Sequence, residues 1–72
     1  MWRRVFRSDK TYSVFQFAGA DAYEEDVGLS FEKAGARADS LHRKTRRRVK
    51  VFDEDLLAKT PYSFPRASYV AR

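Results

Sequence analysis

The chain has 72 residues, with 15 Lys and Arg against 10 Asp and Glu, so its net charge is +5. This length allows one domain. The chain has no Cys, which excludes disulfide frameworks, iron–sulfur clusters and thiolate zinc sites. Because so short a chain buries only about 60% of its unfolded surface, we expect a partner molecule or a second copy to complete it.

Membrane association is not expected. No run of residues approaches the roughly 18 apolar positions that a spanning helix needs. The first seven residues are charged but have no apolar stretch behind them, unlike a signal peptide. We therefore expect a cytoplasmic protein with no membrane partner.

Residues 2–7 and 11–18 are predicted to form a β-hairpin. Both segments are rich in aromatic and β-branched residues, and Ser8, Asp9 and Lys10 supply a turn between them. The second strand carries large apolar side chains on both faces, so both faces need cover. These side chains are Tyr12 and Val14 on one face, and Phe15 and Phe17 on the other.

A helical region is predicted from Asp21, because Asp21 and Glu24 have the spacing of a capping box. Apolar residues then recur at intervals of three and four, as on one face of a helix. Gly28 is unfavourable inside a helix, so the alternative is a short first helix, a break at Gly28, and a second helix capped by Ser30. The apolar positions are Tyr23, Val27, Phe31, Ala34, Ala38 and Leu41.

Residues 48–53 alternate as a third strand, and residues 54–59 are predicted to form one or two helical turns that Pro61 ends. We expect residues 1–59 to form one α+β domain: a three-stranded antiparallel sheet in β-β-α-β order with one main helix. A right-handed crossover would place the third strand beside the first. Residues 60–72 are expected to be an extended aromatic arm that packs on the open sheet face or on a partner.

No catalytic motif is present. The single His, His42, has no orienting carboxylate near it in sequence and no nucleophile motif beside it. The glycines are too far apart for a phosphate loop, and no set of residues has the spacing of a metal site. We expect a protein that is not an enzyme and holds no cofactor or metal.

A basic cluster at residues 42–50 is the strongest functional signal, since six of these nine residues are Lys or Arg. The planar guanidinium of Arg suits phosphate oxygens. A basic cluster beside a sheet with spare aromatic rings predicts a nucleic-acid surface, whose bases could stack on those rings. A solvated face, or a dock for an acidic protein surface, is the alternative. The predicted phosphate contacts are Arg43, Lys44, Arg46, Arg47, Arg48 and Lys50.

A second hypothesis is a protein-binding adaptor or inhibitor. Two apolar sheet faces and one helix leave a face uncovered, and exposed apolar area marks interfaces. An open sheet edge would also permit a homodimer by strand pairing. The predicted partner-binding residues are Trp2, Tyr62, Phe64 and Tyr69.

The nine residues AYEEDVGLS at positions 22–30 resemble a stretch of small phage-encoded anti-CRISPR proteins. The resemblance implies a regulator from a phage or mobile element that acts on nucleic-acid machinery. The present chain is basic, whereas an inhibitor that imitates DNA would be acidic, so the mechanism of DNA mimicry does not carry over.

Overall fold

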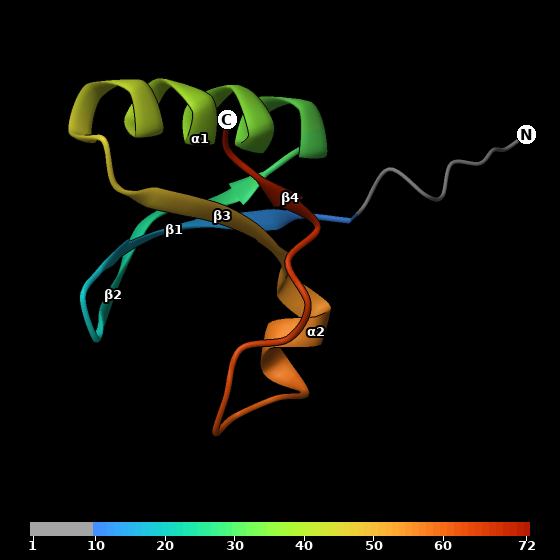
Figure 1. The fold of residues 1–72 in the computed structure, drawn as a ribbon. Helices are drawn as coiled ribbons and strands as arrows, with labels where there is room; N and C mark the ends of the chain where they lie inside the picture. Colours follow the sequence, from blue (N-terminus) through green and yellow to red (C-terminus); the bar gives the residue numbers. More distant parts are fainter. Residues whose placement is uncertain (1–9) are drawn as a thin grey trace, which may run out of the picture.

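The computed structural model describes residues 10–72, which form a small α+β fold (Figure 1). The four strands make one antiparallel sheet in the order β2-β1-β3-β4. The predicted α+β class is confirmed, but the prediction of three strands is wrong, and the strand predicted at residues 2–7 lies outside the described residues. The elements are β1 (Tyr12–Ala18), β2 (Asp21–Leu29), α1 (Phe31–Thr45), β3 (Arg48–Asp53), α2 (Glu54–Ala58) and β4 (Tyr69–Val70).

The hairpin joins β1 to the segment that follows it. Ala18 pairs with Asp21 across a turn of two residues, Gly19 and Ala20. Gly19 has a φ of 63°, the left-handed conformation that a type II′ turn requires at its first central position. This turn returns the chain directly along β1, so the prediction of a helix that begins at Asp21 is wrong.

Contacts with other parts of the fold hold β2 in its extended form. The amide of Gln16 donates to the carboxylate of Glu25 at 2.6 Å. Near the end of β2, the N–H of Gly28 donates to the carboxylate of Glu54 at 2.7 Å. These tertiary contacts outweigh the helical spacing of the apolar residues, because intrinsic preference is a weak determinant of secondary structure.

Ser30 caps helix α1, and its hydroxyl accepts from the N–H of Lys33 at 3.3 Å. The predicted helix capped by Ser30 is therefore confirmed, whereas the short helix predicted before Gly28 is wrong. The inner side of α1 is made mainly of small residues, so the helix can approach the sheet closely and bury its aliphatic side chains. The resulting core contains Val14, Ala34, Ala38, Leu41, Val49, Val51 and Ala71.

Strand β3 is confirmed at the predicted residues. It pairs antiparallel with β1, with Val51 opposite Val14; its predicted pairing with residues 2–7 lies outside the described residues. The following turn forms α2, as the sequence predicts. Asp53 caps α2 by accepting from the N–H of Asp55 at 2.9 Å, and it pairs with Lys10 at 2.8 Å.

The C-terminal segment returns to the sheet and adds β4 beside β3. The hydroxyl of Tyr69 donates to the carboxylate of Asp39 on α1 at 2.8 Å. Its ring lies beside Gly35, where an added Cβ would be 3.9 Å from the ring, an ordinary van der Waals contact. After the stretch that connects α2 to β4, the chain therefore packs on the sheet, and Ala71 is part of the core. Within residues 10–72, neither helix is long and apolar enough to cross a membrane.

Candidate nucleic-acid interface

The face of the sheet opposite α1, called here the outer face, is aromatic. Side chains alternate along a strand, so Phe15 and Phe17 of β1 point away from Val14 and the helix. Phe64 from the C-terminal segment covers them, with ring centroids 5.3 Å from Phe15 and 5.2 Å from Phe17. Beneath it lies Phe52 of β3, 5.1 Å away. The prediction that the C-terminal segment packs on the open face is confirmed for Phe64.

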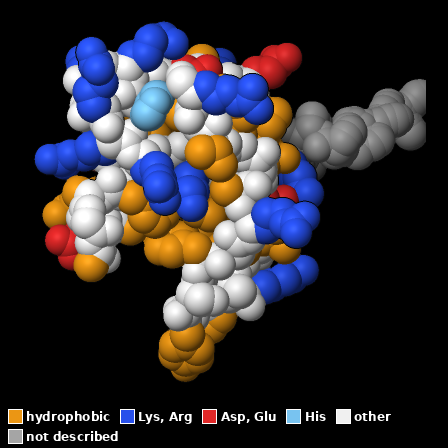
Figure 2. Space-filling model, viewed as in Figure 1, with side chains coloured by type: hydrophobic (Ala, Val, Ile, Leu, Met, Phe, Trp, Pro, Cys, Tyr) orange, Lys and Arg blue, Asp and Glu red, His pale blue; other side chains and the backbone are white. Residues whose placement is uncertain are grey.

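The middle of this aromatic cluster is buried, and its rim is exposed to solvent. The side chain of Phe52 is only 1% exposed, whereas Phe64 keeps 45% of its surface accessible. Figure 2 shows hydrophobic side chains gathered below the sheet, with Lys and Arg side chains over and around them. The outer face therefore presents ring surface and positive charge together.

Two cations of β3 stand on this face. Arg48 is paired with Phe17 and Lys50 with Phe15, and residues directly opposite in a sheet share a face. The ammonium of Lys50 lies 5.3 Å from the centre of the Phe17 ring, within the range of a cation–π contact. Arg48, Lys50, Phe17 and Gly19 line a hollow of about 300 Å³, which we call the cationic pocket.

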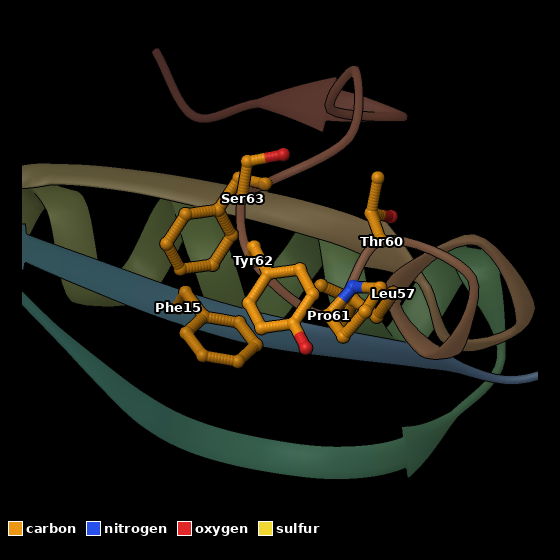
Figure 3. A pocket seen from close by; sticks show the side chains of 7 residues that line it. Phe15, Leu57, Thr60, Pro61, Tyr62 and Ser63 are labelled. Atoms are coloured by element: carbon orange, nitrogen blue, oxygen red, sulfur yellow. The ribbon is translucent and has the colours of Figure 1, made fainter.

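A second hollow of about 460 Å³ lies between β1, α2 and the C-terminal segment. Figure 3 shows its side chains, with Phe15 on one wall and the 60–63 turn on the other. Tyr62 lies at its rim and is 98% exposed. We call this hollow the aromatic groove; it is lined by Phe15, Leu57, Thr60, Pro61, Tyr62, Ser63 and Phe64.

The two hollows are adjacent. Phe17 lines one and Phe15 the other, and residues two apart on a strand are about 6.5–7 Å from each other. The ring of Phe64 contacts both. Together they form a continuous surface, the outer strip, that consists of Arg48, Lys50, Phe17, Phe64, Phe15 and Tyr62.

Glu54 fixes the wall of the aromatic groove. Its carboxylate accepts from the hydroxyls of Thr11 at 2.5 Å and Ser13 at 2.9 Å, and from the N–H of Gly28 at 2.7 Å. The bond from Thr11, followed by that from Gly28, lowers the pKa of Glu54 below its ordinary value. The first turn of α2 is thereby tied to the beginning of β1 and the end of β2, and Leu57 is held beside Phe15.

The remaining predicted phosphate contacts lie around the end of α1. Arg46 has a left-handed φ of 62°, and its N–H donates to the carbonyl of His42 at 2.8 Å. Nδ1 of His42 is 2.7 Å from the carbonyl oxygen of Arg47. Arg43 and Arg46 line a separate hollow with His42 and Arg72. The six predicted residues are therefore divided: Arg48 and Lys50 belong to the outer strip, and the others surround the helix end.

None of the six predicted basic residues forms an ion pair within residues 10–72. The two ion pairs there join Lys10 to Asp53 at 2.8 Å and Arg37 to Asp26 at 3.7 Å. The basic cluster is thus not neutralised by the acidic residues of β2. On β2, Glu24 is paired with Phe15 and so shares the outer face. It places negative charge at the β2 side, and the cations lie on the β3 side.

The predicted partner-binding residues are also divided. Tyr62 and Phe64 belong to the outer strip, but Tyr69 packs against α1 on the other face. Trp2 lies outside the described residues. Phe15 and Phe17 were predicted to share one apolar face of the sheet but were not predicted as site residues. Their alternation with Tyr12 and Val14 was the signal that could have identified them.

Among the part of the chain that the structure describes, no group of three His, Asp or Glu side chains is arranged to hold a metal ion. Comparison with known proteins gives no matching family model, no similar curated protein and no similar solved structure.

Proposed function

We propose that the protein is a non-enzymatic nucleic-acid-binding module whose contact surface is the outer strip. One observation supports this most directly: Arg48 and Lys50 have no ion-pair partner within residues 10–72 and stand beside the aromatic rings of the same face. Unpaired cations attract phosphates and release condensed counterions on binding. Rings that are partly open to solvent supply base contacts.

The experiment measures the affinity for fluorescently labelled oligonucleotides, single-stranded and duplex, by anisotropy across a range of salt concentrations. Affinity should fall steeply with salt, because each phosphate contact contributes a slope of about −0.7 for single strands and −0.9 for duplex DNA. Replacing Arg48 and Lys50 together by Gln should reduce the magnitude of the slope by roughly 1.4 to 1.8.

A matched control removes the same charge elsewhere. Lys33 and Arg37 are exposed on α1, away from the outer face, and Lys33→Gln with Arg37→Gln should leave the slope nearly unchanged. Absence of binding to every oligonucleotide at low salt would refute the proposed function. If the salt slope is unchanged in the Arg48 and Lys50 variant but reduced in the Lys33 and Arg37 variant, the interface lies elsewhere on the protein.

The second candidate is a protein-binding adaptor or inhibitor that uses the same aromatic groove. It is favoured by the apolar lining of the groove and by the exposure of Tyr62 and Phe64, which are 98% and 45% accessible. Exposed apolar surface of this kind marks protein interfaces. This candidate predicts a complex that survives high salt and is lost when Tyr62 and Phe64 are truncated.

A further inference from the structure

The positive charges and the aromatic groove lie at opposite ends of the outer strip. Arg48 and Lys50 occupy one end, and the aromatic groove occupies the other. The rings of Phe17, Phe64 and Phe15 connect the two ends without a break. A ligand that fits this arrangement carries a negative group and, next to it, a flat apolar group.

Tyr62 is the side chain that defines the second end. It is 98% exposed, and it belongs to no ring pair among residues 10–72, in contrast to Phe15, Phe17 and Phe64. The turn at residues 61–63 projects away from the sheet (Figure 1). Both faces of the Tyr62 ring are therefore free, which suits it to stack on a base.

The size of the groove is consistent with this use. Its volume of about 460 Å³ lies within the range of roughly 300–1,000 Å³ that is typical of small-molecule sites. Its lining is mostly apolar, with Phe15, Leu57 and Pro61 beside the ring of Tyr62 (Figure 3). Bases in a duplex are stacked and paired, so they cannot enter such a groove; unpaired bases can.

We infer that the outer strip binds single-stranded nucleic acid, with a phosphate at Arg48 and Lys50 and a neighbouring unpaired base in the aromatic groove against Tyr62. This inference rests on the proposed function and names its substrate class. Glu24, paired with Phe15 on the outer face, repels phosphates at the β2 side and so confines the strand to the β3 side. The acidic edge and the basic strand together set the path of the backbone.

The test compares a labelled thymidine oligonucleotide, single-stranded, with the same oligonucleotide annealed to its complement. The single strand should bind at least about tenfold more tightly at equal salt. Tyr62→Ala should weaken single-strand binding roughly 5- to 100-fold, since one base–aromatic stack is lost, and should leave the salt slope unchanged. Tyr62→Phe keeps the ring and should bind normally, whereas Tyr62→Leu, which is apolar without a ring, should behave as Tyr62→Ala.

Tyr23 provides the matched control. It is an exposed tyrosine of β2, 49% accessible, paired with Gln16 and therefore on the other side of the sheet. Tyr23→Ala should not alter binding. Because Tyr62 is almost entirely exposed, its replacement should also leave the unfolding midpoint unchanged, so lost binding cannot be attributed to lost folding.

The possible failures are distinguishable. Equal or tighter binding to the duplex, with no effect of Tyr62→Ala, would overturn the single-strand inference while the salt-dependent contact through Arg48 and Lys50 stands. A failure of both forms to bind would overturn the proposed function and this inference with it. Normal binding by Tyr62→Leu would show that apolar contact, not stacking, occupies the groove, and would also overturn the inference.

Discussion

The two faces of the sheet are built from the same strands but are closed in different ways. Against α1, the fully buried residues are aliphatic and small, and the rings of Tyr12 and Tyr69 pack beside them; the fully buried residues are Val14, Ala34, Ala38, Val49 and Val51. On the outer face the apolar residues are large rings, over which a single further ring packs, that of Phe64, which remains 45% exposed. Shape explains the difference: alanines permit close contact between helix and sheet, while rings joined edge to face leave accessible surface.

We expect the two faces to have different roles: the inner face contributes most of the free energy of unfolding, and the outer face is the binding surface. A chain of this size has little stability to spare. It can leave an aromatic face partly open only if the other face is well packed.

The largest effect is expected from the inner face. Leu41 is 7% exposed within the core, and Leu41→Ala should lower the free energy of unfolding by about 2–5 kcal/mol. Phe64→Ala should cost less, roughly 1–1.5 kcal/mol, because only half of that side chain is buried, yet it should impair ligand binding more. Urea unfolding measures the first effect and anisotropy the second. Equal losses of stability would mean that the outer face is a second core.

The next effect concerns acid sensitivity at the junction of the two faces. The pKa of Glu54 is lowered by hydrogen bonds from Thr11 and Gly28, and that of Asp53 by its bond with Lys10. A depressed carboxyl stabilises the fold above its unfolded pKa, about 4.3 for Glu and 3.9 for Asp. That contribution is lost as the pH falls through the lower folded value. Stability should therefore decline from about pH 5 downward.

Glu54→Gln tests this explanation. Its neutral amide lacks the charge that strengthens the three hydrogen bonds made by the carboxylate, so at pH 7 the variant should lose about 1–3 kcal/mol. Its stability should then depend less on pH in the acid range. Glu24→Gln, at an exposed carboxylate of β2, serves as the control and should retain the wild-type profile. If Glu54→Gln loses as much stability on acidification as the wild type, groups other than Glu54 cause the acid sensitivity.

The smallest effect is expected at the end of α1. Arg46 adopts a left-handed φ of 62°, which is unfavourable for a residue with a Cβ but free of strain for Gly. After the greater chain entropy of Gly is subtracted, Arg46→Gly should raise the unfolding free energy by roughly 0.5 kcal/mol. The neighbouring Arg47 has no positive φ, so Arg47→Gly should be destabilising instead. Thermal unfolding of the two variants shows whether each one is more or less stable than the wild type.

The sequence was informative where local chemistry and tertiary contacts agree. The Ser30 cap, the alternation of β3 and the break at Pro61 all specify the local backbone, and each appears in the structure. The prediction for residues 21–28 was wrong because Asp21 and Glu24 mimic a capping box. The Gly19–Ala20 turn and the bonds of Glu25 and Gly28 to distant residues decide the outcome. Such contacts are made by residues that are remote in sequence.

The site shows the same limit. Sequence proximity suggested that the cations at residues 43–50 act together, but strand alternation and the left-handed turn at Arg46 direct them to different sides. Conversely, Phe15 and Tyr62 are 47 positions apart in the sequence and line one groove. Only the return of the C-terminal segment to the sheet brings them together.

The order of the strands also bears on self-association. Within residues 10–72, the sheet has two edges, β4, only two residues long, and β2, which is nine residues long. Four carboxylates, those of Asp21, Glu24, Glu25 and Asp26, lie along β2. Antiparallel pairing of two such edges would bring like charges together, which deters runaway stacking of copies into fibres. The long edge therefore favours an oppositely charged strand over a copy of itself.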